Sequence, residues 1–401
     1  MEHKMKIYEI GTGYTPIPAR MGAATEIVVE ELTKAFIKQG QAVEIVDIAS
    51  ANRLPNDLPI REVKVPACFT GTDVKLGLMH KLKRVVYSIA LAGELRKILK
   101  AAEEKIVLHF HNQYNLFFFL KLTTSALRKK CLIAYTNHSG IWRLPWNEVE
   151  DVIKKRYFQE AECMKRADLV FVLNQETKDQ AIEHLKVPRE RLVVIGNGVN
   201  TDLYHPLAEE EKLRVKEKLG MKGRDVILQV GSVYENKGQL RALAYLETLL
   251  KSNPDLCYAY AGGIVDEDYH QQLVDYIRDH NLQEQVQYLG MVSPGGELNE
   301  LYNTALATIL PSRYESFGLV VIESLSAGVP VLLDQLALFY MGEGCVRYDE
   351  AGFAALVEDT ILGVDPDEYV KLCAAARNNA VNNHSWDAIA ENYLHSWENQ
   401  S

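Results

Sequence analysis

The sequence lacks the charge balance, the long apolar runs and the cysteine spacing of several large protein classes. Its 44 lysines and arginines are outnumbered by 54 aspartates and glutamates, for a formal net charge of -10. Because nucleic acid is bound through a basic face, we expect no nucleic-acid partner. No apolar stretch has the length of a signal peptide or a membrane span. The six cysteines form no C-x-x-C pair. We therefore expect a cytoplasmic protein with reduced thiols.

Short apolar runs alternate with helix-length segments along the chain, in two series. The first series has runs at residues 6–11, 42–48, 105–111, 131–136, 168–173 and 191–196, and the second at 225–231, 257–263, 286–290, 305–312 and 329–334. Such alternation indicates parallel sheets with crossover helices, and 401 residues exceed what one core usually supports. We predict an α/β protein of two Rossmann-like domains, with a boundary near Asn197 to Pro206. Ligands of such sheets bind at the carboxyl ends of the strands, so we expect the sheets to face a central cleft.

The most informative segment, Pro311 to Leu332, places two carboxylates around a strand-to-helix turn. The run ATILPS is typical of a buried strand, and Phe317 to Ala327 is typical of a helix. Glu315 then lies in the loop and Glu323 on the helix, roughly 9 Å of helix axis beyond Phe317 at about 1.5 Å per residue. Helix N-terminal amides attract phosphate, and carboxylates accept hydrogen bonds from hydroxyls, so the spacing suits a nucleotide sugar. The alternative is that Glu315 caps the helix and Glu323 is solvated.

The same segment, PSRYESFGLVVIESLSAGVPV, resembles the E-x7-E signature of family four retaining glycosyltransferases, which have the GT-B architecture. Three further stretches, GSVYENKG at 231–238, AGG at 261–263 and NGVNTDLYHP at 197–206, resemble that family's first phosphate loop, a strand end near the nucleotide and its interdomain segment. The resemblance implies an N-terminal, acceptor-side domain at residues 1–198 and a C-terminal, donor-side domain at 199–383. A last helix at 384–401 would cross back to the N-terminal domain.

The resemblance also implies roles for individual residues. Glu323 would hold the ribose and Glu315 the donor hexose, while Lys237 would bind the diphosphate. The catalytic residues expected are Glu315, His138 and Lys237, and further donor contacts are expected from Gly22, Ser232 and the amides of Phe317, Gly318 and Leu319. His138 would bond a donor hydroxyl or support the leaving group, and the acceptor contacts assigned are His111 and Arg20. The family's enzymes need no metal and no further cofactor, because protein dipoles and a cation stabilise the departing nucleotide diphosphate.

Two departures from the family pattern leave alternatives open. Ser232 stands where the family has an arginine, and LLDQLALFYMGEG replaces the usual glycine pair and glutamate after the last strand. Both reduce the expected contacts to the donor phosphates. A weakened enzyme, or a catalytically silent nucleotide-sugar-binding homologue, would show such changes, and an epimerase or phosphorylase would share the fold.

Three histidines follow or end strands of the first series. His109 and His111 alternate about Phe110 and point to the same side of their strand. A metal site would need a third ligand, which the sequence does not place. We expect His109 to be a hydrogen-bonded interior residue and His111 to lie further out.

The acceptor is the least determined partner. The segment Lys75 to Lys100 carries apolar residues at helical spacing and a cluster of basic residues near its start. It is either an amphipathic helix packed on the first sheet or a membrane-surface helix, which would place the enzyme at the inner membrane face. The sequence thus predicts transfer from a nucleotide diphosphate sugar, with uridine as the expected base, to a hydroxyl of a glycan, a lipid-linked sugar or a small molecule. The transfer would retain the anomeric configuration, and cell-surface glycan or glycolipid synthesis is the expected setting.

Overall fold

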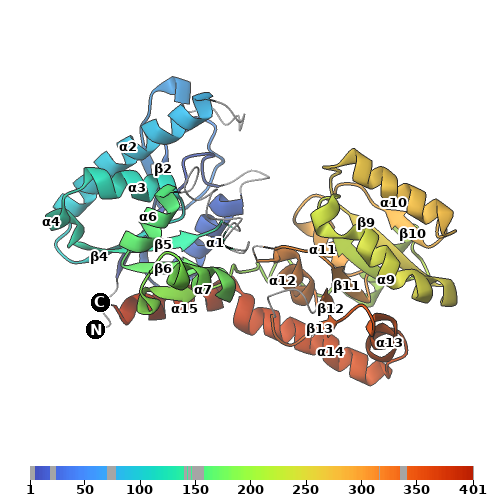
Figure 1. Cartoon of the computed structure of the whole chain (residues 1–401). Coiled ribbons are helices and arrows are strands. Elements are labelled where there is room, and N and C mark those ends of the chain that lie inside the picture. Colours follow the sequence, from blue (N-terminus) through green and yellow to red (C-terminus); the bar gives the residue numbers. More distant parts are fainter. Residues whose placement is uncertain are drawn as a thin grey trace. The chain divides into compact units, whose positions relative to one another are not determined.

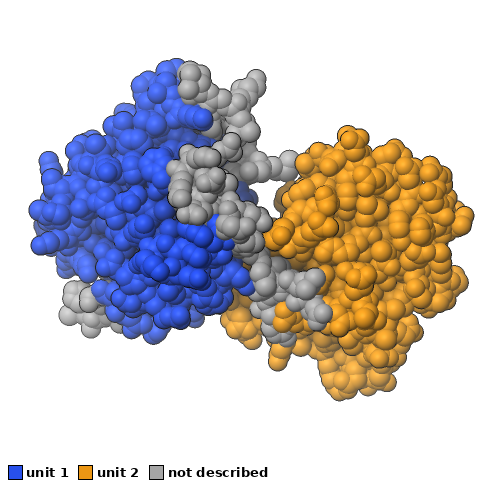
Figure 2. Space-filling model, in the orientation of Figure 1, with its two compact units in different colours: residues 1–197, 386–401 blue, residues 198–385 orange. Residues whose placement is uncertain are grey.

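The structure is a computed structural model that describes residues 5–18, 24–69, 78–139, 142, 146, 158–315, 317–334 and 341–400. The chain divides into two compact units (Figure 2). Unit 1 comprises residues 1–197 and 386–401, and unit 2 comprises residues 198–385.

Unit 1 is built on a seven-stranded parallel sheet with the strand order β3-β2-β1-β4-β5-β6-β7. The strands are β1 (Lys6–Ile10), β2 (Ala42–Ile48), β3 (Ile60–Val63), β4 (Ile106–Phe110), β5 (Cys131–Asn137), β6 (Leu169–Val172) and β7 (Leu192–Val194). Its helices are α1 (Ala24–Lys38), α2 (Leu78–Ala101), α3 (Gln113–Leu122), α4 (Ser125–Arg128), α6 (Phe158–Arg166), α7 (Gln175–Glu183) and α15 (Trp386–Glu398).

The two faces of this sheet carry separate cores, because successive side chains of a strand point to opposite faces. Tyr8 packs with residues of α2, α3 and α6 on one face, whereas the preceding Ile7 packs with α1 and α15 on the other. The second face includes a cluster of aromatic rings in which Phe36 of α1 contacts Tyr393 and Trp397 of α15. The last helix of the chain is therefore part of the core of unit 1, and Figure 1 shows it beside the elements of that unit.

Unit 2 contains a six-stranded parallel sheet with the strand order β10-β9-β8-β11-β12-β13. The strands are β8 (Asp225–Val230), β9 (Leu256–Ala261), β10 (Val286–Tyr288), β11 (Ala307–Leu310), β12 (Val331–Asp334) and β13 (Cys345–Tyr348). Its helices are α8 (Glu209–Lys218), α9 (Gln239–Ser252), α10 (Glu267–Asp279), α11 (Gly296–Tyr302), α12 (Leu319–Ser326), α13 (Phe353–Val357) and α14 (Pro366–Asn379).

Both sheets have the doubly wound order in which the first strand lies beside the second and the fourth. This order confirms the predicted α/β class with two Rossmann-like sheets. The strand order reverses between β1 and β4 in unit 1, and between β8 and β11 in unit 2. Ligands of open α/β sheets bind at the carboxyl ends of the strands at this reversal, which is called the topological switch point. The two switch points are therefore where a site is to be sought.

The helix expected from Lys75 to Lys100 is present as α2, whose start at Leu78 follows residues outside the described part. Its inner face packs on the sheet through Tyr87, Leu91 and Leu95, whereas Leu82 and Ile89 remain 46% and 48% exposed. Within the described residues, every helix is too short or too polar to cross a membrane. A contact of α2 with a membrane surface stays a prediction.

Candidate functional site

The loops that follow β8 and β11 are joined side by side at the switch point of unit 2. Asn236 makes this connection. Its side-chain amide donates to the carbonyl oxygen of Tyr314 at 2.9 Å and its side-chain oxygen accepts from the Tyr314 amide at 3.2 Å. Its own carbonyl oxygen accepts from the amide of Arg313 at 2.9 Å, and Arg313 pairs with Glu235 at 3.0 Å. The two loops are thus held in a fixed register.

Gly238 allows the close approach of these loops. It ends the first loop in the left-handed region, with φ of 70°, and a Cβ at this position would lie 2.6 Å from the carbonyl oxygen of Pro311. A side chain here would therefore meet backbone, which cannot move aside as a flexible side chain can. Glycine at this position permits both the backbone angle and the contact.

Lys237 and Glu315 meet across the two loops. The lysine Nζ lies 2.5 Å from a carboxylate oxygen of Glu315, and the two side chains are 20% and 11% exposed. The Lys237 carbonyl oxygen accepts from the Gln229 side chain of β8 at 2.7 Å, and the Ser232 carbonyl oxygen accepts from Gln239 at 3.0 Å. The structure thus brings together the cation and the loop carboxylate that the sequence singled out, with Ser232 in the same loop as Lys237.

The helix that carries Glu323 begins two residues later than predicted. Phe317 is buried, Gly318 adopts a left-handed conformation with φ of 87° as the N-cap residue, and α12 starts at Leu319. The first amides of a helix have no intrahelical acceptor, so this end remains a suitable anion-binding position. Ser312, at the end of β11, adds a buried hydroxyl with no hydrogen-bond partner among the described residues. No sequence pattern marks Ser312 as a site residue.

Glu323 is held by two tyrosines that sequence reasoning missed. The Tyr302 hydroxyl donates to Glu323 Oε2 at 2.8 Å, and Tyr204 bonds the same carboxyl group. Burial raises the pKa of Glu323, although the hydrogen bonds from Tyr302 and Tyr204 act to lower it. The alternative of a solvated helix residue is therefore not supported. No sequence pattern joins residues 204, 302 and 323, because they meet only through the fold.

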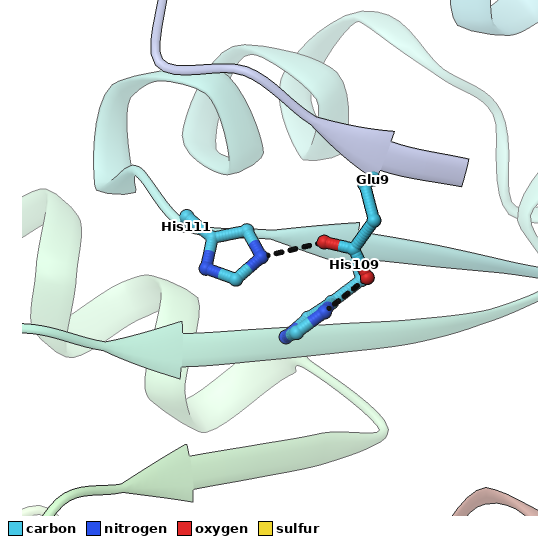
Figure 3. A group of neighbouring side chains, drawn as sticks. All are labelled: Glu9, His109 and His111. Atoms are coloured by element: carbon cyan, nitrogen blue, oxygen red, sulfur yellow. Dashed lines mark hydrogen bonds and ion pairs between the residues drawn. The ribbon is translucent and has the colours of Figure 1, made fainter. Parts of the chain in front are cut away.

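At the switch point of unit 1, Glu9 bridges two histidines (Figure 3). One oxygen of Glu9 lies 2.8 Å from His109 Nδ1 and the other lies 2.7 Å from His111 Nε2. All three side chains have no exposed surface. His109 lies on β4 and His111 directly follows its last residue. The two rings point to the same side of the sheet, as their alternation predicted, and Glu9 comes from the neighbouring β1.

Hydrogen bonds continue from both rings. His111 Nδ1 lies 3.0 Å from His138 Nε2, and His138 is only partly buried as a residue. His109 Nε2 lies 2.7 Å from the Thr136 hydroxyl, which in turn lies 3.1 Å from the hydroxyl of Tyr393 on α15. His109 is thus the interior residue that was expected. The complete burial of His111, with both ring nitrogens bonded, argues against the direct acceptor contact that was assigned to it.

Glu9, His109 and His111 also form a group of candidate metal ligands, because their ligand atoms all lie within 4.8 Å of one another. Glu9 is the third side chain that the sequence could not place. However, each carboxylate oxygen is already bonded to a facing ring nitrogen at 2.7 or 2.8 Å. A bound ion would have to replace these bonds, so the arrangement is better described as a hydrogen-bonded relay.

Several predicted positions lie outside the described residues. These are Gly22 and Arg20, and residues 335–340 of the loop after β12. Their assigned contacts with donor or acceptor stay predictions.

Comparison with protein families gives two matches that together reach both units. Residues 25–203 match the model of "Glycosyltransferase Family 4", and residues 211–337 match that of "Glycosyl transferases group 1". The second match contains Lys237, Glu315 and Glu323. The first contains the histidines of the relay.

Curated relatives agree with these matches. The glycogen synthase of Mycobacterium tuberculosis is 26% identical over 238 residues, which are 58% of this chain and 54% of that protein. The chain spans about half the length of the first curated relatives it matches. A GDP-mannose:cellobiosyl-diphosphopolyprenol alpha-mannosyltransferase of Xanthomonas oryzae is 24% identical over 97% of this chain and 96% of its own length.

Solved structures show the same fold over nearly the whole chain. The Anabaena protein HepE, crystallised with UDP and glucose, aligns with a TM-score of 0.65 and 14% identity over 98% of this chain and 99% of its own. The two sheets, the family matches and these relatives lead to one assignment: the chain belongs to the family four type of glycosyltransferases and has the GT-B fold.

Proposed function

We propose that the protein transfers a hexose from a UDP-sugar to an acceptor hydroxyl, with retention of configuration at the anomeric carbon. The observation that carries the proposal is the group at the switch point of unit 2. There, Glu315, the start of α12 and Glu323, which two tyrosines bond, belong to the β11–loop–α12 unit. Lys237 reaches Glu315 from the neighbouring loop after β8.

The diphosphate is assigned to Lys237 and the amides of Phe317, Gly318 and Leu319. A lysine ammonium has three N–H donors, so the bond to Glu315 leaves Lys237 able to bond phosphate oxygens as well. The positive end of the α12 dipole adds to this attraction. These donors stabilise the nucleotide diphosphate as it departs, and no metal is needed for that step in the mechanism that we propose.

The two carboxylates are assigned to hydroxyl groups. A carboxylate has about four lone-pair sites, of which the tyrosines bond two at Glu323, so that it can still accept from both ribose hydroxyls. Glu315, held by Lys237, accepts from the donor hexose. His138 accepts from a substrate hydroxyl, and the departing phosphate takes the acceptor proton, so that no separate general base is required.

Uridine is proposed as the base because HepE, which shares the fold, was crystallised with UDP and glucose. The Xanthomonas relative is named for GDP-mannose instead, which makes guanosine the competing base. Titration calorimetry with UDP, GDP and ADP on the full chain separates the two. We expect UDP to bind most tightly.

Lys237→Ala should weaken UDP binding by about 10-fold to 100-fold, because a hydrogen bond to a charged group contributes about 1.5–3 kcal/mol. Lys251→Ala, which removes an exposed lysine of α9, is the matched control and should bind UDP as the wild type does. Failure of all three nucleotides to bind the folded wild type, or equal binding by Lys237→Ala, would contradict the proposal.

Turnover of UDP-sugars by the wild type and by Glu315→Ala tests the step beyond binding. The proposal requires UDP release by the wild type and its loss in the variant. A wild type that binds UDP but releases none from any UDP-sugar would instead be a silent binding homologue.

A further inference from the structure

We propose that Glu9 is a positioning residue which, through His111, fixes His138 in the tautomer with its proton on Nε2 and a lone pair on Nδ1. The role of His138 toward the substrate rests on the proposed function. The positions of the protons between Glu9, His111 and His138 follow from unit 1 alone and do not depend on that function.

The first step follows from the chemistry of Glu9. An ionised carboxylate can only accept hydrogen bonds, and its two oxygens lie 2.8 Å from His109 Nδ1 and 2.7 Å from His111 Nε2. Both facing nitrogens must therefore carry a hydrogen. Burial alone would raise the pKa of Glu9, but the charge and hydrogen bonds of His109 and His111 lower it to about 2, so that Glu9 is ionised at neutral pH.

The second step concerns His111, which has one nitrogen left. Its side chain has no exposed surface, and burial together with the neighbouring His109 lowers its pKa to about 4. The ring is therefore neutral near pH 7, with its single hydrogen on Nε2 and a lone pair on Nδ1. That lone pair lies 3.0 Å from His138 Nε2, which must then be the donor.

The third step leaves His138 with one available atom. Its ring stacks on His111, with centroids 5.3 Å apart and planes inclined by 21°, so its orientation is held as well as its proton. Burial and the neighbouring His111 lower the pKa of His138 well below its ordinary value, so the ring is neutral at pH 7. Since Nε2 carries its one hydrogen, Nδ1 can only accept a hydrogen bond. No hydrogen bond of this atom is found within the described part of the chain, and His138, which is only partly buried as a residue, is the outer end of the relay.

The other branch of the relay does not control His138. His109 Nε2 meets the hydroxyl of Thr136, and that hydroxyl meets the hydroxyl of Tyr393. Hydroxyl groups can turn to donate or to accept a hydrogen bond. This branch can therefore accommodate His109 whether or not its Nε2 carries a hydrogen. Thr136 therefore provides a control that is buried in the same relay.

The consequence is a rule for the substrate. The group that faces His138 Nδ1 must donate a hydrogen bond, as a sugar hydroxyl does. A carboxylate oxygen, a phosphate oxygen or a fluorine would face the lone pair with another acceptor. The relay thus favours neutral hexosyl donors over uronic acids at this position.

The test reads the tautomer directly, by long-range proton–nitrogen NMR on the full chain labelled with ¹⁵N-histidine. His138→Gln assigns the signals. The wild type and Thr136→Val should show His138 with a protonated Nε2 and an unprotonated Nδ1 at pH 7. Glu9→Leu removes the acceptor that holds the proton of His111, and His111→Phe removes the acceptor of His138. Both variants should populate the other tautomer of His138.

A wild-type His138 with a protonated Nδ1, or a tautomer unchanged in both Glu9→Leu and His111→Phe, would overturn the inference. If Glu9→Leu does not fold, the wild-type signal and His111→Phe still decide.

A second readout separates the relay from the proposed function. Glu9→Leu should lower kcat/KM for the UDP-hexose by about 10-fold, the ratio that one neutral hydrogen bond supplies, while UDP itself binds as in the wild type. In deoxyfluoro donors, a fluorine replaces one hydroxyl of the hexose. For one of these donors, the replacement should lower the binding affinity of the wild type but change that of Glu9→Leu little. Equal discrimination in both proteins would contradict the link to substrate. If UDP does not bind at all, the proposed function fails while the NMR result stands by itself.

Discussion

At the scale of single residues, the two carboxylates of the unit 2 site have different kinds of partner. Glu315 is paired with a cation, whereas Glu323 is bonded by neutral hydroxyls. A cation compensates the negative charge, and a tyrosine hydroxyl does so only in part. Burial raises the pKa of Glu323, and the hydrogen bonds from Tyr302 and Tyr204 offset this rise only in part.

This difference predicts a pH dependence of donor binding. Protonation removes acceptor capacity from Glu323, and its raised pKa means that this happens at a higher pH than for a carboxyl of ordinary pKa 4.5. The affinity for UDP-glucose should therefore fall as the pH drops through that raised pKa. UDP-glucose is the suitable ligand because it has no terminal phosphate monoester to titrate.

Two variants check the assignment by calorimetry at several pH values. Glu323→Gln should bind UDP-glucose more weakly at neutral pH and lose the acid-dependent fall. Tyr302→Phe removes a bond that lowers the pKa, so the fall should move to higher pH. A pH profile that is the same in wild type and Glu323→Gln would show that another group is responsible.

At the scale of elements, the contact between the loops after β8 and β11 determines whether Lys237 reaches Glu315. Gly238→Ala should weaken UDP binding and lower the melting temperature, because its Cβ would lie 2.6 Å from the Pro311 carbonyl oxygen. Gly223→Ala is a matched control. Its φ of 76° imposes a similar backbone strain, of about 1–2 kcal/mol, but nothing lies within 4 Å of its Cβ.

The measurements are the melting temperature and UDP affinity of both variants. Gly223→Ala should lose some stability and keep its affinity for UDP. Gly238→Ala should lose more of both. Equal effects of the two substitutions would show that the loop contact has no influence on the site.

The sequence was sufficient for the elements that make up the two cores. The strands with buried, apolar runs were found where they were predicted, whereas the four-residue strands β3 and β13 were missed. Both are edge strands of their sheets. An edge strand pairs on one side only, so its sequence needs fewer apolar residues. The start of α12 was misplaced by two residues because the left-handed Gly318 precedes it.

The candidate site was predictable where a short segment carries its own pattern, as 231–238 does with Lys237 and 311–332 does with Glu315 and Glu323. It was not predictable where the partners come from distant segments. Glu9 joins residues about a hundred positions further along, and Tyr204 and Tyr302 join Glu323 through the fold. Such contacts depend on strand order, which the alternation of apolar runs does not specify.

At the scale of the whole molecule, the last helix stabilises the unit that begins the chain. Trp397→Ala should lower the stability of unit 1 by about 3–5 kcal/mol, the usual cost of truncating a buried tryptophan, because this side chain is fully buried against Phe36 and Phe171. Asp387→Ala on the same helix removes an exposed pair with Lys38 and should cost about 1 kcal/mol or less. Thermal unfolding of both variants, with UDP as a reporter of unit 2, checks this.

A melting transition that is the same in Trp397→Ala and Asp387→Ala would show that α15 contributes little to the core. Loss of UDP binding in folded Trp397→Ala would instead show that the two units are coupled more strongly than separate cores require.

The central claim is that a nucleotide diphosphate sugar is bound at the switch point of unit 2, between Lys237, the start of α12 and Glu323. A crystal structure of the protein with a non-transferable UDP-hexose tests it most directly. The account predicts the diphosphate at Lys237 and at the amides of Phe317, Gly318 and Leu319, the ribose at Glu323 and the hexose at Glu315. A UDP-hexose bound elsewhere on the protein, with Lys237 still paired to Glu315 and no ligand atom at Glu323, would contradict it.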